Sequence, residues 1–258
     1  MTLTQTAILS FIEGLTEFLP VSSTGHLILA SELLRIPSTD VHKSFEIAIQ
    51  LGAILAVVVL YGPTLLRNRR TLLLTATAFV PIAVIGFLLH GIVKQFLLGN
   101  VSVVLWALFI GGIVLVIFES FLPSRRPGKP EGLPTEISLL QAIMVGMCQS
   151  LAIIPGVSRS AATIVGGELL GISRKAIVEF SFLLAIPTMA AAIGYDLLKS
   201  AGEFTSGDWG NLLIGFVLSF FFALVAVRWF VAYVKEHSFA VFGVYRMLLA
   251  LTFLLLLK

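Results

Sequence analysis

The segment LTQTAILSFIEGLTEFLPVSSTGHLILASELLR, residues 3–35, contains the pattern that decides the fold. It is apolar on both sides of a central break, LPVSSTG, at residues 19–25. The part after the break, residues 24–35, would form a helix only about 18 Å long, whereas the hydrocarbon core of a bilayer is about 30 Å thick. We therefore expect residues 3–35 to form a re-entrant helix–loop–helix hairpin, with its tip enclosed by protein or by a water-filled cavity.

A second segment, residues 137–171, repeats this pattern with its break, IPGVSRS, at residues 154–160. The proline of each break lies 25 positions before a phenylalanine, in the pairs Pro20 and Phe45, and Pro155 and Phe180. The two copies are thus 135 residues apart, with a one-residue shift at the serines that follow each proline. We expect residues 137–171 to form a second re-entrant hairpin.

Six further stretches are long and apolar enough to cross a bilayer, which requires about 20 residues. They lie near residues 44–61, 72–91, 101–121, 177–198, 211–233 and 239–257. Hydrophobic residues make up 58% of the chain and charged residues only 12%, against about 25% charged in soluble domains. We therefore predict an all-α polytopic membrane protein, and the continuous apolar runs exclude a β-barrel.

The two halves of the chain are expected to have opposite orientations in the membrane. A hairpin returns to the side on which it started, whereas three spans do not, so the second half must be inserted upside down. We predict an inverted-topology repeat over residues 1–122 and 137–258, joined by a linker over residues 123–136. Each half has one re-entrant helix–loop–helix and three transmembrane helices.

Basic residues predict which side faces the cytoplasm, where lysine and arginine are enriched. Nine fall on one predicted side: Arg67, Arg69, Arg70, Arg125, Arg126, Lys129, Arg174, Lys175 and Lys235. Five fall on the other: Arg35, Lys43, Lys94, Lys199 and Lys258. The first side is therefore predicted to be cytoplasmic, with both termini and the active site on the extracytoplasmic side. The net charge of +3 is interpreted as this topology signal, and no nucleic-acid partner is expected.

Two glutamates, Glu13 and Glu17, precede the first break and share one face of a helix. Two like charges at membrane depth are costly unless they are protonated, paired with a cation or bound to a metal ion. Beside a bound phosphate, a divalent cation such as Mg²⁺ or Ca²⁺ would relieve the repulsion between the anions. The pair is therefore the predicted metal site.

Hydroxyl side chains follow the proline of the first break, at the start of a new helix. These are Ser22, Ser23 and Thr24, and His26 lies in the first turn of that helix. Hydroxyls at such positions cap the helix. Unpaired N–H groups and the helix macrodipole attract anions to the same place.

The second break has the same design with a cation added, because Ser158 and Ser160 flank Arg159. A guanidinium group can donate two parallel hydrogen bonds to a phosphate. Two such helix starts that converge at the tips of opposed hairpins predict a site for a compact phosphate-bearing ligand. Together with the acid pair, they indicate metal-assisted phosphate chemistry.

Each cluster by itself has a simpler structural explanation. Serines after a proline often only cap a helix, a Glu–x₃–Glu pair can face a solvated vestibule, and His26 can bond to a buried carbonyl. Ionisable groups inside a membrane are functional by default, however, and here they coincide at two related breaks. Glu46 and Gln50 are expected to support the site or to pack between helices. Internal ion pairs are expected for most of Glu168, Glu179, Asp196 and Arg246.

The motifs EGLTEFLPVSSTGHL, residues 13–27, and PGVSRSAATI, residues 155–164, closely resemble the two signatures of the undecaprenyl pyrophosphate phosphatase family, the bacitracin-resistance family. Residues 43–59 and 171–187 also resemble family blocks, as does the pair Tyr245–Arg246. The resemblance implies an integral enzyme of the bacterial inner membrane that needs a divalent cation. It implies removal of the terminal phosphate of undecaprenyl pyrophosphate, which yields the lipid carrier used in cell-wall synthesis.

The resemblance also implies roles for individual residues. The catalytic positions fall on Glu13, Glu17, Ser23, His26 and Arg159, and the phosphate contacts on Ser22, Thr24, Ser158 and Ser160. Our first hypothesis has Ser23 as the nucleophile and His26 as its general base, and the alternatives are attack by His26 or by activated water.

The expected partners are the lipid substrate and the surrounding membrane lipids. The polyprenyl tail of the substrate would lie along an apolar groove open to lipid, so membrane lipids are the other expected contact. A homodimer is a further expectation. A polyprenyl-phosphate flippase is the rival function, because inverted repeats with broken helices are typical of transporters.

Overall fold

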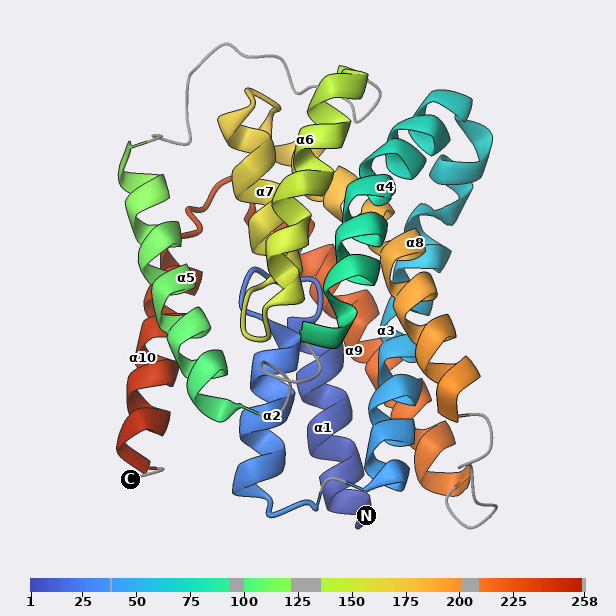
Figure 1. The fold of residues 1–258 in the computed structure, drawn as a ribbon, viewed down its shortest axis with the longest axis vertical. Coiled ribbons are helices and arrows are strands. Elements are labelled where there is room, and N and C mark those ends of the chain that lie inside the picture. The colour runs from blue at the N-terminus through green and yellow to red at the C-terminus, as the bar shows by residue number, and fades with distance from the viewer. Residues whose placement is uncertain (38, 93–99, 122–135, 201–208, 257–258) are drawn as a thin grey trace.

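The computed structural model describes residues 1–37, 39–92, 100–121, 136–200 and 209–256, and these ranges contain helices and no strand. In chain order the elements are α1 (Leu3–Thr16), α2 (Ser23–Leu33), α3 (Asp40–Arg67), α4 (Arg69–Ile92), α5 (Val101–Phe121), α6 (Leu139–Gln149), the 3₁₀ helix η3 (Ser150–Ile153), α7 (Arg159–Leu169), α8 (Arg174–Ser200), α9 (Trp209–Tyr233) and α10 (Ala240–Leu256) (Figure 1). The predicted all-α class is confirmed for this part of the chain. The predicted linker, residues 123–136, lies outside the described residues except for its last position.

Five helices, α3, α4, α5, α8 and α9, are long and apolar enough to cross a membrane. They coincide with five of the six predicted spans. The sixth predicted span forms α10, a shorter apolar helix of 17 residues, which is about 26 Å long at 1.5 Å per residue. The protein is therefore a multi-pass membrane protein, as predicted.

The outer surface of these helices is strongly apolar. Leu66, Phe87 and Phe121 are each 78% exposed or more. Exposed side chains of this size are unfavourable in water, whereas hydrocarbon accepts them without cost. Inside, α3 packs along α9 and α5 along α10. Glycines allow close approach where backbones meet, because a Cβ on Gly52 would lie 2.2 Å from the carbonyl oxygen of Phe216.

Both broken segments form a pair of short helices. In the first, α1 ends at Thr16 and α2 begins after Ser22, whose φ of 72° lies in the left-handed region. In the second, α6 and η3 lead to Gly156, with a φ of 93°, and α7 begins after Ser158. Both α2 and α7 have 11 residues and are about 16 Å long, too short to cross a bilayer.

The two helix pairs share their capping interactions at a separation of 136 residues. Each pair begins with a capping box, formed by Thr2 and Gln5 in α1 and by Ser138 and Gln141 in α6. Each of these glutamines then donates from Nε2 to the carbonyl oxygen after its short second helix, Leu34 in the first pair and Leu170 in the second. The sequence spacing of 135 residues holds for Pro20 and Pro155 and for Phe45 and Phe180, whereas the capping residues of the two hairpins are 136 positions apart.

The two pairs lie in opposite halves of the molecule, and their turns meet near its middle (Figure 1). Ser158 Oγ and Ser160 Oγ of the second turn both donate to the carbonyl oxygen of Leu19 in the first, at 3.3 and 2.7 Å. The start of α1 and the end of α10 lie at one end of the molecule, and the junction of α3 with α4 lies at the other (Figure 1). Residues 139 positions apart in the chain are thus in direct contact.

Candidate active site

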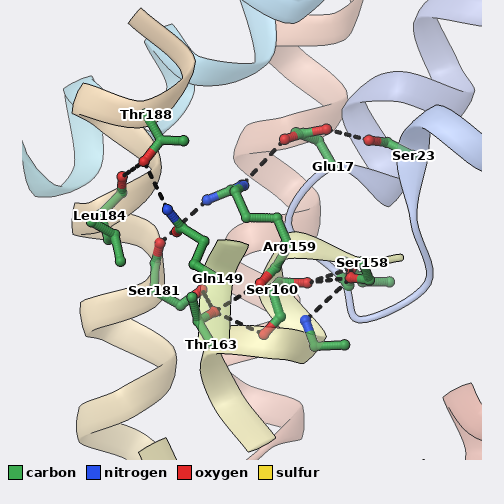
Figure 2. Close-up of polar contacts among 12 residues, drawn as sticks. Glu17, Ser23, Gln149, Ser158, Arg159, Ser160, Thr163, Ser181, Leu184 and Thr188 are labelled. Carbon is green, nitrogen blue, oxygen red and sulfur yellow. Dashed lines mark hydrogen bonds and ion pairs between the residues drawn. The ribbon is translucent and has the colours of Figure 1, made fainter. Parts of the chain in front are cut away.

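Glu17 of the first tip forms an ion pair with Arg159 of the second tip. Arg159 Nη2 donates to Glu17 Oε1 at 3.1 Å, and Ser23 Oγ donates to the other oxygen, Glu17 Oε2. Figure 2 shows the carboxylate between the guanidinium and the hydroxyl. The side chains of Arg159 and Glu17 are only 13% and 11% exposed, so their charges attract each other more strongly than at a protein surface.

Arg159 is held from two further directions. Its Nη1 donates to the carbonyl oxygen of Ser181 in α8 at 3.4 Å, and its Cζ lies 5.8 Å from the ring centroid of Phe18. Thr163, one turn later on α7, shares a hydrogen bond of 2.7 Å with the Ser181 hydroxyl. The guanidinium therefore has a fixed position beside the first tip, and two tips with opposite charges form one site.

A cavity of about 660 Å³ opens at this site. Its polar wall consists of Glu17, Ser22, Ser23, Thr24, Gln50, Gln149, Ser158, Arg159 and Thr188. Its apolar wall comes mainly from α4 and α8. The cavity thus has the charged and hydroxylic groups that bind a phosphate and, beside them, a surface suited to hydrocarbon.

The predicted phosphate-binding residues divide into two groups. Ser22 and Ser158 cap α2 and α7, accepting from Gly25 N at 3.4 Å and Ala161 N at 3.2 Å, and both line the cavity. Thr24 lines the cavity and is exposed. Ser160 is 1% exposed and lies outside the cavity lining, with its hydroxyl bonded to Leu19. In this geometry Ser160 joins the two tips, because its hydroxyl donates to a carbonyl oxygen of the first tip.

The two ring nitrogens of His26 bond to residues other than Ser23. Its Nδ1 lies 2.7 Å from the carbonyl oxygen of Ser22, and its Nε2 lies 2.8 Å from the hydroxyl of Tyr245 on α10. Both ring nitrogens are therefore engaged, and His26 is not among the residues that line the cavity. His26 was the expected general base for Ser23, but the Ser23 hydroxyl is hydrogen-bonded to Glu17.

Glu13 is completely buried, and neither oxygen of its carboxylate has a hydrogen-bond partner. The charges that act on it belong to Glu17, Glu46 and Arg159. The carboxylate oxygens of Glu13, which accept no hydrogen bond, fit Mg²⁺ or Ca²⁺. These ions often bind through one or two carboxylates and the phosphates of the substrate. No group of three or more His, Cys, Asp or Glu side chains within the described ranges is arranged to hold an ion. A cation here would thus need ligands from the phosphates as well.

Arg246 belongs to the four residues of which most were expected to form internal ion pairs, but its side chain bonds to the backbone. The side chain is 1% exposed and donates instead to four backbone carbonyl oxygens. These belong to Pro20 and Gly156, one in each tip, and to Ala107 and Leu108 in α5, at 3.1–3.3 Å. A planar group with five donors suits such a cluster, which no lysine can satisfy. Arg246 therefore joins both tips to α5.

The ion pair predicted for Glu168 is present. Arg174 donates to Glu168 at 2.7 Å and to Glu119 at 2.6 Å, and its guanidinium lies 4.2 Å from the ring centroid of Phe239. This cluster links α5, α7 and α8 at the ends of those helices, away from the tips. The side chain of Asp196 lies outside the described residues.

Sequence reasoning missed Gln149, Thr188 and Tyr245 as site residues. Gln149 is completely buried, donates from Nε2 to Thr188 Oγ1 at 3.1 Å and has an Oε1 without a partner. A separation of 136 residues pairs Gln149 with Glu13, so a repeat alignment made across the whole hairpin would have found it. Gln50, predicted as a supporting residue, does line the cavity.

Fold and site together define a polytopic membrane protein with a cavity, lined by charged and hydroxyl groups, between two helix-pair tips. Residues 6–252 match the family described as bacitracin resistance protein BacA, and the chain belongs to this family. Its relatives include the undecaprenyl-diphosphatase of Aquifex aeolicus, 50% identical over 98% of each chain. The undecaprenyl-diphosphatase of Thermus thermophilus is 50% identical over 94% of this chain and 93% of its own. That of Sulfurihydrogenibium sp. is 45% identical over 99% of each.

Proposed function

We propose that this protein hydrolyses undecaprenyl diphosphate to undecaprenyl phosphate and inorganic phosphate. The shared name of the relatives supports this activity. The observation that carries it is the double engagement of Glu17, by the Arg159 guanidinium and by the Ser23 hydroxyl. A hydroxyl bonded to a carboxylate is the arrangement of an activated nucleophile, and a guanidinium beside it suits the phosphate that is attacked. By its family the protein is also assigned to bacitracin resistance and cell-wall synthesis.

The chemical step begins with attack by Ser23 Oγ on the terminal phosphorus. The bond from this phosphorus to the bridging oxygen breaks, and undecaprenyl phosphate leaves with the electron pair. Glu17 accepts the proton of Ser23, the role that we had predicted for His26. Arg159 and the N–H groups at the starts of α2 and α7 stabilise the transferring phosphoryl group. Water then hydrolyses the phosphoserine, which releases phosphate and restores Ser23.

His26 is proposed as a positioning residue in this scheme. Its bonds to the Ser22 carbonyl and to Tyr245 hold the start of α2, and so the position of Ser23. Thr24 and the capping residues Ser22 and Ser158 are proposed as phosphate contacts, because they line the cavity. Ser160 supports this set through the bond between the tips.

A divalent cation, Mg²⁺ or Ca²⁺, is proposed to be held by Glu13 and Glu17 together with the diphosphate. When bound, it would supply positive charge that offsets repulsion between the carboxylates and the phosphates. Glu13 is suited to this role because its two buried oxygens have no other partner.

The membrane arrangement belongs to the same proposal. The helix pairs α1–α2 and α6–α7 are re-entrant hairpins that enter from opposite sides, in two inverted repeats over residues 1–122 and 137–258. The common capping pattern and the opposed pairs in Figure 1 support this arrangement. The excess of basic residues supports an orientation in which the end with the α3–α4 junction lies on the cytoplasmic side of a bacterial inner membrane. The active site then faces the extracytoplasmic side. Hydrolysis of an impermeant substrate by right-side-out vesicles tests this orientation, and hydrolysis only in inverted vesicles would contradict it.

Trapping the covalent intermediate tests the reaction. Purified protein is incubated with undecaprenyl diphosphate labelled in the terminal phosphate, quenched, and analysed for bound label. We expect an acid-stable, base-labile phosphoserine that is absent from Ser23→Ala, together with a loss of phosphate release. An acid-labile phosphohistidine would assign the attack to His26. Full activity of Ser23→Ala would remove serine from the mechanism.

The flippase alternative has no support from these relatives, which carry the name of a hydrolase. It would predict lipid movement without phosphate release from the purified protein. Phosphate release that EDTA abolishes and added Mg²⁺ or Ca²⁺ restores would support both the hydrolase and its proposed cation.

A further inference from the structure

One face of α4 lines the apolar part of the cavity. It consists of Phe79, Ile82, Ala83, Gly86 and Phe87. Spacings of three, four, seven and eight residues place these side chains along a single stripe of a helix. The stripe begins where α4 packs against the second hairpin, because a Cβ on Gly146 of α6 would touch both Ala78 and Pro81.

The facing wall comes from α8 and begins at the polar end of the cavity. Thr188 is bonded to Gln149 beside the second tip, and Tyr195 lies seven residues further along α8. Seven residues of helix cover about 10 Å. The lining residues between them are Met189, Ala191, Ala192 and Ile193. The cavity therefore continues well beyond the charged site along an apolar path.

This path is open at Gly86. A Cβ built on Gly86 meets no heavy atom within 4 Å, so the space beside the backbone is empty of protein. The neighbouring Phe87 is 80% exposed, so this part of the wall reaches the outer surface of the helix bundle. A glycine inside a helix is destabilising relative to alanine, because its backbone loses more conformational freedom on folding. The open space next to the cavity is a reason to have glycine at this position.

The volume of the cavity exceeds what a diphosphate needs. Pockets of roughly 300–1,000 Å³ hold drug-sized organic ligands, and the 660 Å³ measured here lies within that range. The polar end of the wall includes Gln149, whose Nε2 is bonded to Thr188. A ligand with a polar head and an apolar continuation would contact both walls.

We infer that the path between α4 and α8 holds the first isoprene units of the lipid substrate, and that Gly86 keeps this path open and thereby determines whether long polyprenyl chains are accepted. This inference rests on the proposed function. Each buried methylene group adds binding free energy, so kcat/KM rises with chain length until the chain leaves the path for the surrounding lipid. A large side chain at position 86 removes that gain and leaves the phosphate site intact.

The chain offers a matched control on the facing helix. Gly194 of α8 is also a helical glycine with no heavy atom within 4 Å of a built Cβ, but it is not among the residues that line this cavity. Phenylalanine at position 194 therefore tests the general effect of a large residue on an open helix surface. Gly86→Ala and Gly86→Leu give intermediate sizes at the position of interest.

The experiment measures phosphate release by purified protein in detergent from isopentenyl, farnesyl and undecaprenyl diphosphate. For Gly86→Phe we expect kcat/KM for undecaprenyl diphosphate to fall at least tenfold, while the value for isopentenyl diphosphate stays within twofold of the wild type. Gly86→Leu should lie between Gly86→Phe and the wild type. Gly194→Phe should match the wild type on all three substrates.

Three results would overturn the inference: an equal loss on all substrates in both Gly86→Phe and Gly86→Leu, no loss on the long-chain substrate, or the same loss in Gly194→Phe. A fold defect in Gly86→Phe would appear as loss on isopentenyl diphosphate, and Gly86→Leu then decides the question by the same chain-length criterion. The proposed function fails in a different way, because wild-type protein would then release no phosphate from any of the three. That result would reject the function and this inference together.

Discussion

At the first tip, Ser22 caps α2, and at the second tip, 136 positions later, Ser158 caps α7 in the same way. The residues that follow these caps differ, since Ser23 begins α2 and Arg159 begins α7. Further back, Glu13 in α1 corresponds to Gln149 in α6. The first tip thus contributes the carboxylate and the serine proposed as the nucleophile, and the second contributes the guanidinium. One arrangement of two short helices with a serine cap, used twice, divides the proposed chemistry between two halves that are incomplete alone.

This division explains why the tips must touch. Glu17 of the first tip is buried beside Arg159 of the second, and either charge alone at this depth would be strongly unfavourable. Their attraction, the two serine bonds to Leu19 and the four bonds of Arg246 all join the same two turns. The contact that assembles the active site is also the contact that stabilises the tips.

The largest effect is expected from removing the cation of the second tip. Arg159→Ala should lower kcat by about 1,000-fold or more, because one group that stabilises a transferring phosphoryl is worth that much. Arg159→Lys should recover part of the activity, since it keeps the charge but loses the planar fork. Phosphate release is the measurement, and Arg228→Ala, an exposed arginine of α9, is the control. Activity of Arg159→Ala within tenfold of the wild type would remove this residue from the site.

The second-largest effect is expected from replacing Glu13 with glutamine, the residue that stands at the equivalent position, Gln149, in the second hairpin. Glu13→Gln should lower activity by roughly 100-fold, as removal of a metal-orienting group does. It should leave the thermal stability unchanged or higher, because a buried acid without a hydrogen-bond partner is removed. The measurement is activity against divalent-ion concentration together with Tm. An unchanged ion requirement would show that Glu13 is not a ligand.

A smaller effect on activity is expected from the residue that joins the tips. Arg246→Lys cannot satisfy four carbonyl oxygens, and we expect a loss of about 3 kcal/mol from the unsatisfied groups. That corresponds to a fall in Tm of roughly 6–12 °C for a chain of this size, with about tenfold lower activity. Arg228→Lys is the control for the change of residue type. A Tm equal to that of the wild type would show that the four bonds contribute little.

The smallest effect is expected at the partner of His26. Tyr245→Phe removes one hydrogen bond worth about 1 kcal/mol, so kcat should fall by roughly fivefold. If His26 acts only by position, His26→Gln should retain more activity than His26→Ala, because glutamine also has a donor and an acceptor. Loss of all activity in both His26 variants, with Tm unchanged, would assign His26 a direct chemical role.

Much of this architecture can be predicted from local patterns. Hydrophobicity, proline positions and residue spacing predict the six apolar spans, the two broken segments and their capping serines. These signals act over a few turns of helix. The charged residues of the site could be found for the same reason, since Glu13, Glu17 and Arg159 stand out within apolar segments.

Partner choice within the site could not be predicted. Ser23 lies three residues from His26 and six from Glu17, and the spacing favoured the histidine. The left-handed backbone at Ser22 turns the chain so that the Ser23 hydroxyl meets the carboxylate, while the His26 ring meets Tyr245, 219 positions away. The role of Arg246 could not be predicted for a related reason, because no sequence pattern reveals four converging carbonyl oxygens.

The sequence by itself determined the class of membrane protein, the duplicated helix breaks and the set of reactive groups, because these depend on hydrophobic burial and helix capping between near neighbours. Only the tertiary structure decided that Glu17 lies between Ser23 and Arg159, that Arg246 joins both tips, and that an apolar path passes Gly86. Those features depend on the packing of helices that are distant in the chain, and packing follows from the shapes of all the side chains together.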